Sequence, residues 1–182
     1  MKIISIILLA WMSAFNQGGQ GLYVCKNAQI SLYSEAPIEN IEAKSQKGTS
    51  VYNAATGDLA FSLPINSFVF AKSLMQEHFN ENYMESDKYP QASFKGKIQE
   101  QVDVSKDGSY PVTVTGVLNV HGVSQNRSIK GTIAVKGGVV TMTSEFMVKC
   151  ADHKITIPTI VFHNIAESIR IQVSATYDAY KK

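Results

Sequence analysis

Apolar and polar residues alternate with a period of two along much of the chain after residue 22. In each alternating segment every second side chain is aliphatic or aromatic, which predicts β-strands with one buried face and one solvated face. The segments are 110–120, 128–136, 140–149 and 168–177, then 59–63, 92–98 and the region of Ile30 and Leu32. Gly137 and Gly138 are typical of a two-residue hairpin turn. Because the connections are short, we expect eight or nine antiparallel strands.

One stretch, residues 73–85, has helical rather than strand spacing. Its apolar residues Met75, Phe79 and Tyr83 recur every four positions. Three glutamates recur in the same way on another face: Glu77, Glu81 and Glu85. Ser73 is placed to cap the first turn, and Gln76 is placed to reach back to it. We predict an amphipathic helix of roughly three to four turns, with Met75, Phe79 and Tyr83 covering one end or edge of the sheet.

The apolar faces of the strands must be buried together, which makes the fold class all-β with one helix. An antiparallel β-barrel of about eight strands buries them and removes exposed sheet edges; a two-sheet sandwich would also bury them. The residues predicted to form the inner wall are Phe61, Leu63, Phe94, Ile98, Val112, Val114, Leu118, Val120, Ile133, Met142, Phe146 and Val148. A barrel of this size either holds one small ligand or is filled by its own side chains. The sequence leaves both readings open: an apolar ligand cavity, or a solid core that acts through surface contacts.

The first 21 residues predict a secretory signal peptide. Lys2 supplies a positive start, the run Ile3–Phe15 is apolar, and residues 16–21 are small and polar. The run is short for a membrane span, and its flanks fit a signal peptide better than an anchor. We divide the chain into a signal peptide, residues 1–21, and one domain, residues 22–182, and we expect a periplasmic or secreted protein. The cleavage point is not defined by the pattern.

The composition limits the partners. The chain has 182 residues, 18% of them charged, and a net charge of +2 with no basic block. This charge distribution lacks the basic patch that is typical of nucleic-acid-binding proteins, so we expect no nucleic-acid partner. A homodimer through the outer wall and a transient contact with a membrane are left open by the pattern.

Two cysteines, Cys25 and Cys150, are candidates for a disulfide in an oxidising compartment. Closing so long a loop would stabilise the fold by roughly 4–5 kcal/mol in the chain-entropy model. The alternative is two unrelated thiols, because the sequence does not show whether they are close.

The residues give little support for catalysis or metal binding. Ser124 is not in a G-x-S-x-G elbow, and the neighbours Asp152 and His153 would point to opposite faces of a strand. The histidines are His78, His121, His153 and His163, and none has the spacing of a metal site. We expect no enzyme activity, no catalytic residue, no metal and no cofactor, and we interpret the histidines as exposed polar residues.

Several segments in order resemble the YceI-like family. Residues 88–94 (KYPQASF) are similar to its strand with the pattern aromatic-Pro-x-Ala-x-Phe, and residues 116–124 (GVLNVHGVS) to its strand and turn G-x-L-x-[IV]-x-G-[VI]-[TS]. The C-terminal third is similar over 146–149, 152–155 and 169–177, and the helix over 74–79 and 85–86. The resemblance covers most of the chain after the predicted signal peptide. It is weakest at residues 23–30, where many members have a Trp-bearing strand and a His-Ser pair.

The resemblance implies a lipocalin-like antiparallel barrel with a long apolar tunnel, exported to the periplasm in bacteria. It also implies an amphiphilic ligand of the polyisoprenoid class, such as a polyprenyl phosphate or a quinone side chain. Phe94, Leu118 and Val120 are carried over by position as inward-facing wall. The unmatched first strand leaves the mouth of the tunnel and the head-group preference open.

Overall fold

The computed structural model describes residues 21–35, 39–157 and 165–180. Its strands are β1 (Leu22–Glu35), β2 (Asn40–Asn53), β3 (Asp58–Pro64), β4 (Val69–Phe70), β5 (Gln91–Ile98), β6 (Gly108–Val120), β7 (Val123–Lys136), β8 (Val139–Lys149) and β9 (Ser168–Ala179). Its helical segments are η1 (Ile65–Ser67), α1 (Ser73–His78), η2 (Phe79–Tyr83) and η3 (Cys150–His153). Residues 1–20 of the predicted signal peptide, and His163, lie outside the described residues.

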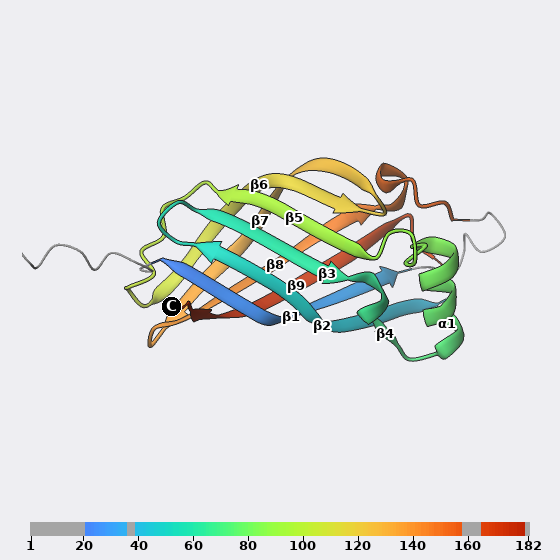
Figure 1. The fold of residues 1–182 in the computed structure, drawn as a ribbon, viewed down its shortest axis with the longest axis horizontal. Helices are drawn as coiled ribbons and strands as arrows, with labels where there is room; N and C mark the ends of the chain where they lie inside the picture. Colours follow the sequence, from blue (N-terminus) through green and yellow to red (C-terminus); the bar gives the residue numbers. More distant parts are fainter. Residues whose placement is uncertain (1–20, 36–38, 158–164, 181–182) are drawn as a thin grey trace, which may run out of the picture.

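The strands close into one antiparallel barrel (Figure 1). Their order around the wall is β1-β9-β8-β7-β6-β5-β3-β2, and β1 pairs with β2 to close the ring. The two-residue strand β4 pairs antiparallel with the N-terminal half of β2, at Ala43 and Lys44. The prediction of an all-β antiparallel barrel of about eight strands is confirmed, and closure excludes the two-sheet sandwich.

Strands β5 to β9 follow the alternation read from the sequence. Phe94 lies opposite Leu118, and Ile133 lies opposite Met142, so that apolar residues face inward across successive strands. Gly137 and Gly138 form the hairpin between β7 and β8 with φ of +57° and +81°, a conformation that glycine adopts without the steric cost of a Cβ.

Strand β2 gave no alternation signal because its inner face is built from small and polar residues. Ala43, Ser45, Ser50 and Tyr52 are buried there. Gly48 lies on the same face, where a Cβ would come within 2.4 Å of Ile30 Cδ1. The small residues allow β1 and its Ile30 side chain to pack closely against β2.

The helix is shorter and less regular than predicted. α1 has six residues, and the chain continues as the five-residue π-helix η2. The N-cap is Lys72 rather than Ser73, and no side chain caps the helix. Gln76 does not reach back to Ser73; its Oε1 accepts a hydrogen bond from the Phe70 amide at 3.2 Å. In the described ranges, none of the helices has the length and apolar content needed to cross a bilayer.

Candidate functional site

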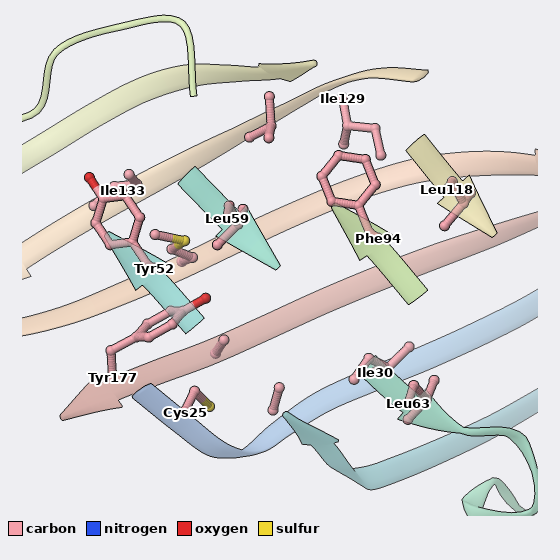
Figure 2. Close-up of a cluster of buried hydrophobic side chains, with 14 of the residues drawn as sticks. Cys25, Ile30, Tyr52, Leu59, Leu63, Phe94, Leu118, Ile129, Ile133 and Tyr177 are labelled. Carbon is pink, nitrogen blue, oxygen red and sulfur yellow. The ribbon is translucent and has the colours of Figure 1, made fainter. Parts of the chain in front are cut away.

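A cavity of about 220 Å³ lies inside the barrel. Its wall is almost wholly aliphatic and aromatic, and it is contributed by β1, β3 and β5 to β9 together with residues of the cap. Phe94 lies beside Leu118 and Ile129 in this interior, and Ile30 of β1 lies near Leu63 of β3 (Figure 2). An interior with so few polar groups favours hydrocarbon over a polar ligand, because a buried polar group without a partner costs free energy.

All twelve residues predicted as inner wall line this cavity: Phe61, Leu63, Phe94, Ile98, Val112, Val114, Leu118, Val120, Ile133, Met142, Phe146 and Val148. Their contact with a ligand stays a prediction. Of the three predicted cover residues, Phe79 lines the cavity, and Met75 packs against the buried core beside it. Tyr83 is half-buried outside the cavity wall, and burial raises the pKa of its phenol.

Other wall residues were missed for identifiable reasons. Ile65 and Phe68 follow Pro64 through a 3-10 turn, where neither strand nor helix spacing applies. Met84 follows the π-helix and is out of step with the predicted helical face. Ile129, Ile169, Ile171 and Val173 also line the cavity. They lie in segments whose alternation the sequence shows, but they were not included in the predicted wall.

One end of the barrel is closed by its own side chains, and we call it the closed end. Tyr52 and Tyr177 are buried there with their ring centroids 6.3 Å apart, and Cys25 lies beside them (Figure 2). Ser50 Oγ donates to the Ala60 carbonyl at 2.8 Å. The serine has one hydroxyl proton, so Tyr177 donates the hydrogen bond that joins the two hydroxyls at 2.6 Å. Burial raises the pKa of Tyr177 well above its usual value, and the phenol remains neutral.

The opposite end, the capped end, is covered by α1 and η2 (Figure 1). The Phe79 ring packs edge-on against Phe68 and at a tilt against Phe70, with ring centroids 5.6 Å and 5.0 Å away. Met84 is buried beneath the same segment and lines the cavity. The cap is therefore attached through side chains, whereas the closed end belongs to the strands themselves.

A polar cluster of Glu85, His121 and His153, the rim cluster, joins the cap to the barrel. His121 Nε2 lies 2.9 Å from Glu85 Oε2, and its Nδ1 lies 3.1 Å from the His153 carbonyl oxygen. The Tyr89 ring packs edge-on against the His121 ring, with the two ring centroids 4.5 Å apart. The three non-glycine residues with positive φ in the described ranges are Glu85, His121 and Lys154, which follows His153. Such backbone strain persists only where surrounding contacts hold it in place.

The interpretation of the histidines as exposed residues is wrong for two of them. His121 is 9% exposed, and His153 is fully buried with its Nδ1 3.1 Å from the Val123 carbonyl oxygen. The turn after β6 and the segment η3 meet at one rim, which the sequence does not show. In the described ranges, no group of three or more metal-ligating side chains comes together.

The disulfide considered from the sequence is not formed, since Cys25 and Cys150 are both free and buried. Cys25 lies at the closed end beside Tyr177, whereas the Cys150 amide donates to the carbonyl oxygen of Glu167, the residue before β9. Strand β9 spans about 30 Å from Ser168 to Tyr177 at a rise of about 3.3 Å per residue. That separation is far beyond the reach of a disulfide.

The comparisons with known proteins agree with this geometry. A YceI-like domain model matches residues 27–177, and no curated protein matches the sequence. Among solved structures, the chain is similar to a polyisoprenoid binding domain from Saccharophagus degradans, with a TM-score of 0.74, 12% identity, and coverage of 88% of this chain and 99% of that one. It is also similar to BcnA of Burkholderia cenocepacia, with a TM-score of 0.69, 17% identity, and coverage of 82% and 95%.

A third similar structure is the YCEI protein of Campylobacter jejuni, with a TM-score of 0.62, 19% identity, and coverage of 81% of this chain and 90% of that one. At these identities the structural likeness shows the fold alone. The family model, in contrast, covers most of the chain and includes the cavity strands. The chain belongs to the YceI-like family.

Proposed function

We propose that this protein binds an isoprenoid lipid, with the hydrocarbon tail inside the barrel, and carries or stores it. The observation that carries the proposal is the apolar cavity of about 220 Å³ enclosed by the strands. The polyisoprenoid binding named for the Saccharophagus degradans domain supports the same ligand class. A filled core, the alternative left open by the sequence, does not fit this interior.

Burial of hydrocarbon is the expected driving force. Each CH₂ group removed from water contributes about 0.8 kcal/mol, so a five-carbon isoprene unit contributes on the order of 3 kcal/mol before ordering costs. The wall has aliphatic and aromatic groups but no polar array suited to catalysis, so the proposed role is binding without chemistry. A quinone or a polyprenyl phosphate would be a ligand here and not a cofactor.

The size of the cavity limits how much of the tail fits without rearrangement. An apolar cavity of about 150 Å³ holds one benzene-sized molecule, so about 220 Å³ accommodates roughly one or two isoprene units. A longer tail must displace flexible side chains such as Met84 and Met142 or move the cap. Affinity is therefore expected to rise with the first isoprene units and then to level off.

We also propose that the protein acts outside the cytoplasm, in the periplasm or as a secreted protein, and meets membranes transiently. The apolar run near the N-terminus supports export. Two large apolar side chains at the capped end support membrane contact, since Val69 is 67% exposed and Leu74 is 58% exposed. A dimer through the outer wall is a separate expectation, which a mass measurement in solution would test.

Native mass spectrometry of the purified protein, followed by solvent extraction, tests the proposed function. We expect an excess mass that is released by solvent and identified as an isoprenoid. A ligand-free protein is then incubated with geranylgeraniol, and uptake is measured again. A ligand-free mass together with no uptake would overturn the proposal.

A further inference from the structure

Two neighbouring strands of the barrel separate along part of their length. β7 and β8 pair from Lys136 and Val139 to Gly131 and Ser144, and there the pairing stops. Within the described residues, no main-chain pair joins 123–130 to 145–149. Each of these segments keeps its ladder with the strand on its other side, β7 with β6 and β8 with β9. We call this break in the wall the β7–β8 seam.

Side chains bridge the seam in place of the main chain. Ser144 Oγ donates to the Lys130 carbonyl at 2.6 Å, and Gln125 Nε2 donates to the Asp152 carbonyl at 2.8 Å. The Arg127 guanidinium donates to the Met147 carbonyl. By the alternation of β7, Gln125 and Arg127 share the inward register of the cavity residue Ile129. Polar side chains thus replace apolar ones on the inner register of the strand at the place where the wall opens.

The seam lies directly against the cavity. Ile129, Phe146 and Val148 belong to the two segments that border it, and all three line the cavity. Where the seam begins, the residues 130–132 and 143–144 line both the cavity and a polar groove on the outside of the barrel. A ligand at this place can have hydrocarbon inside the barrel and a polar group in the slit between the strands.

The charges at the seam favour an anion. Its bordering segments, 123–130 and 145–149, carry Arg127, Lys130 and Lys149 against one acid, Glu145. The Glu145 carboxylate is already engaged, because it accepts from Gln172 at 2.6 Å and lies 3.7 Å from Arg170. The three cations outnumber the two acids at the seam, Glu145 and Asp152, whose carbonyl oxygen accepts from Gln125.

Arg127 is the arginine available to bind an anion. The other arginine of the chain, Arg170, pairs with Glu35 and Glu145, whereas Arg127 makes no ion pair among the described residues. A guanidinium has five N–H donors in a planar fork that matches phosphate oxygens in a bidentate arrangement. Its contact with the Met147 carbonyl leaves most of these donors free.

We infer that the β7–β8 seam is the head-group site of the lipid and that Arg127 binds a phosphate group there while the tail occupies the cavity. This inference rests on the proposed function and narrows its ligand class to anionic isoprenoids, of the isoprenyl phosphate type, in preference to neutral ones. Arg127 is then a specificity-determining residue, since it distinguishes ligands by their head group and not by their tail.

The test compares two ligands with the same tail, geranylgeranyl monophosphate and geranylgeraniol, by titration against the purified protein. We expect the wild-type protein to bind the phosphate more tightly than the alcohol. Arg127→Gln should weaken binding of the phosphate at least about tenfold and change binding of the alcohol less than about twofold. Arg127→Lys, which keeps the charge but not the planar fork, should give an intermediate loss.

Lys47→Gln is the control, because it removes one positive charge from an exposed position of β2, across the ring from the seam, and both affinities should stay within about twofold. Thermal unfolding of each variant confirms that it is folded. Equal affinity of the wild type for both ligands, or equal weakening of both by Arg127→Gln, would overturn the head-group site and leave the cavity proposal standing. A wild-type protein that takes up neither ligand would overturn both proposals.

Discussion

The two ends of the barrel are closed in different ways. At the closed end, Tyr52 and Tyr177 belong to the strands, and a hydrogen bond to Ser50 holds the Tyr177 hydroxyl. At the capped end, a segment inserted between β4 and β5 covers the cavity and is attached through aromatic packing and the rim cluster. One end can therefore open without disturbing the ladder of the barrel, and the other cannot.

Because of this difference, we expect the closed end to govern the stability of the fold and the capped end to govern the rates of lipid uptake and release. Side chains embedded in strands are part of the cooperative core, whereas a short helical segment held by a few contacts is able to open locally. Changes at the closed end should lower the free energy of unfolding with little effect on lipid binding. Changes at the capped end should alter the rates of lipid uptake and release, and a bulky residue in the cavity should weaken lipid binding most strongly.

The largest effect is expected when the cavity near the capped end is filled. Leu118→Trp places an indole where Leu118 lines the lumen, so lipid affinity should fall by at least about tenfold. Val117→Trp is the matched control, because the neighbouring side chain points outward and is 41% exposed. Uptake of a fluorescent isoprenoid by both folded variants measures the effect. Unchanged uptake in Leu118→Trp would mean that the ligand does not occupy this part of the lumen.

The next effect is expected at the rim cluster. His121→Asn removes the contacts with Glu85 and the His153 carbonyl, and asparagine tolerates the positive φ at this position. Lipid release, followed by stopped-flow fluorescence, should become roughly threefold to tenfold faster, with a stability loss of about 1–3 kcal/mol. His78→Asn, an exposed site on α1, serves as the control. Release at the wild-type rate would show that the cap does not limit exchange.

A smaller effect is expected at the closed end. Tyr177→Phe removes the hydroxyl that donates to Ser50, while Ser50 keeps its hydrogen bond to the Ala60 carbonyl. The free energy of unfolding by denaturant should fall by about 1 kcal/mol, with no change in lipid affinity. Tyr180→Phe, at a residue that is 48% exposed, should change neither quantity. A loss of lipid affinity in Tyr177→Phe would contradict the separation of the two ends.

The smallest effect compares the two cysteines. Cys150 lines the cavity at the capped end, and burial raises the pKa of its thiol. Less of it is thiolate at a given pH, so its alkylation by iodoacetamide should keep rising with pH beyond the range where a free thiol levels off. Bound lipid should slow the reaction of Cys150 about twofold or more and leave that of Cys25 unchanged, as measured by mass spectrometry of peptides. Equal protection of both thiols would indicate global stabilisation rather than occupation of the cavity.

How much of the fold the sequence reveals depends on the chemistry of each inner face. Strands β6 to β9 were predicted because valine, isoleucine and methionine alternate with polar residues along them. Strand β2 was missed because Ser45, Gly48 and Ser50 fill its inner face. These residues are buried for reasons of space and hydrogen bonding, which a hydrophobic pattern does not register.

The candidate site also has residues that the sequence pattern predicted and residues that it missed. Its twelve predicted wall residues all line the cavity, because a strand with one apolar face must turn that face inward. Residues outside regular strands escaped prediction, as Phe68 after a 3-10 turn and Met84 after a π-helix show. The burial of His121 and His153 was also missed, since it arises from two loops that meet only when the barrel closes.

The sequence alone determined that the chain forms antiparallel strands, each with one apolar face to bury, because the period of alternation fixes which side chains share a face. The choice between a barrel and a sandwich was made by the closure of the ring between β1 and β2. Only the tertiary structure decided that the interior is hollow, that its two ends are closed differently, and that β7 and β8 separate beside Arg127. Cavity volume and strand separation depend on how the side chains of all the strands pack against one another in three dimensions. That packing is a property of the closed barrel and is not contained in the alternation of any single strand.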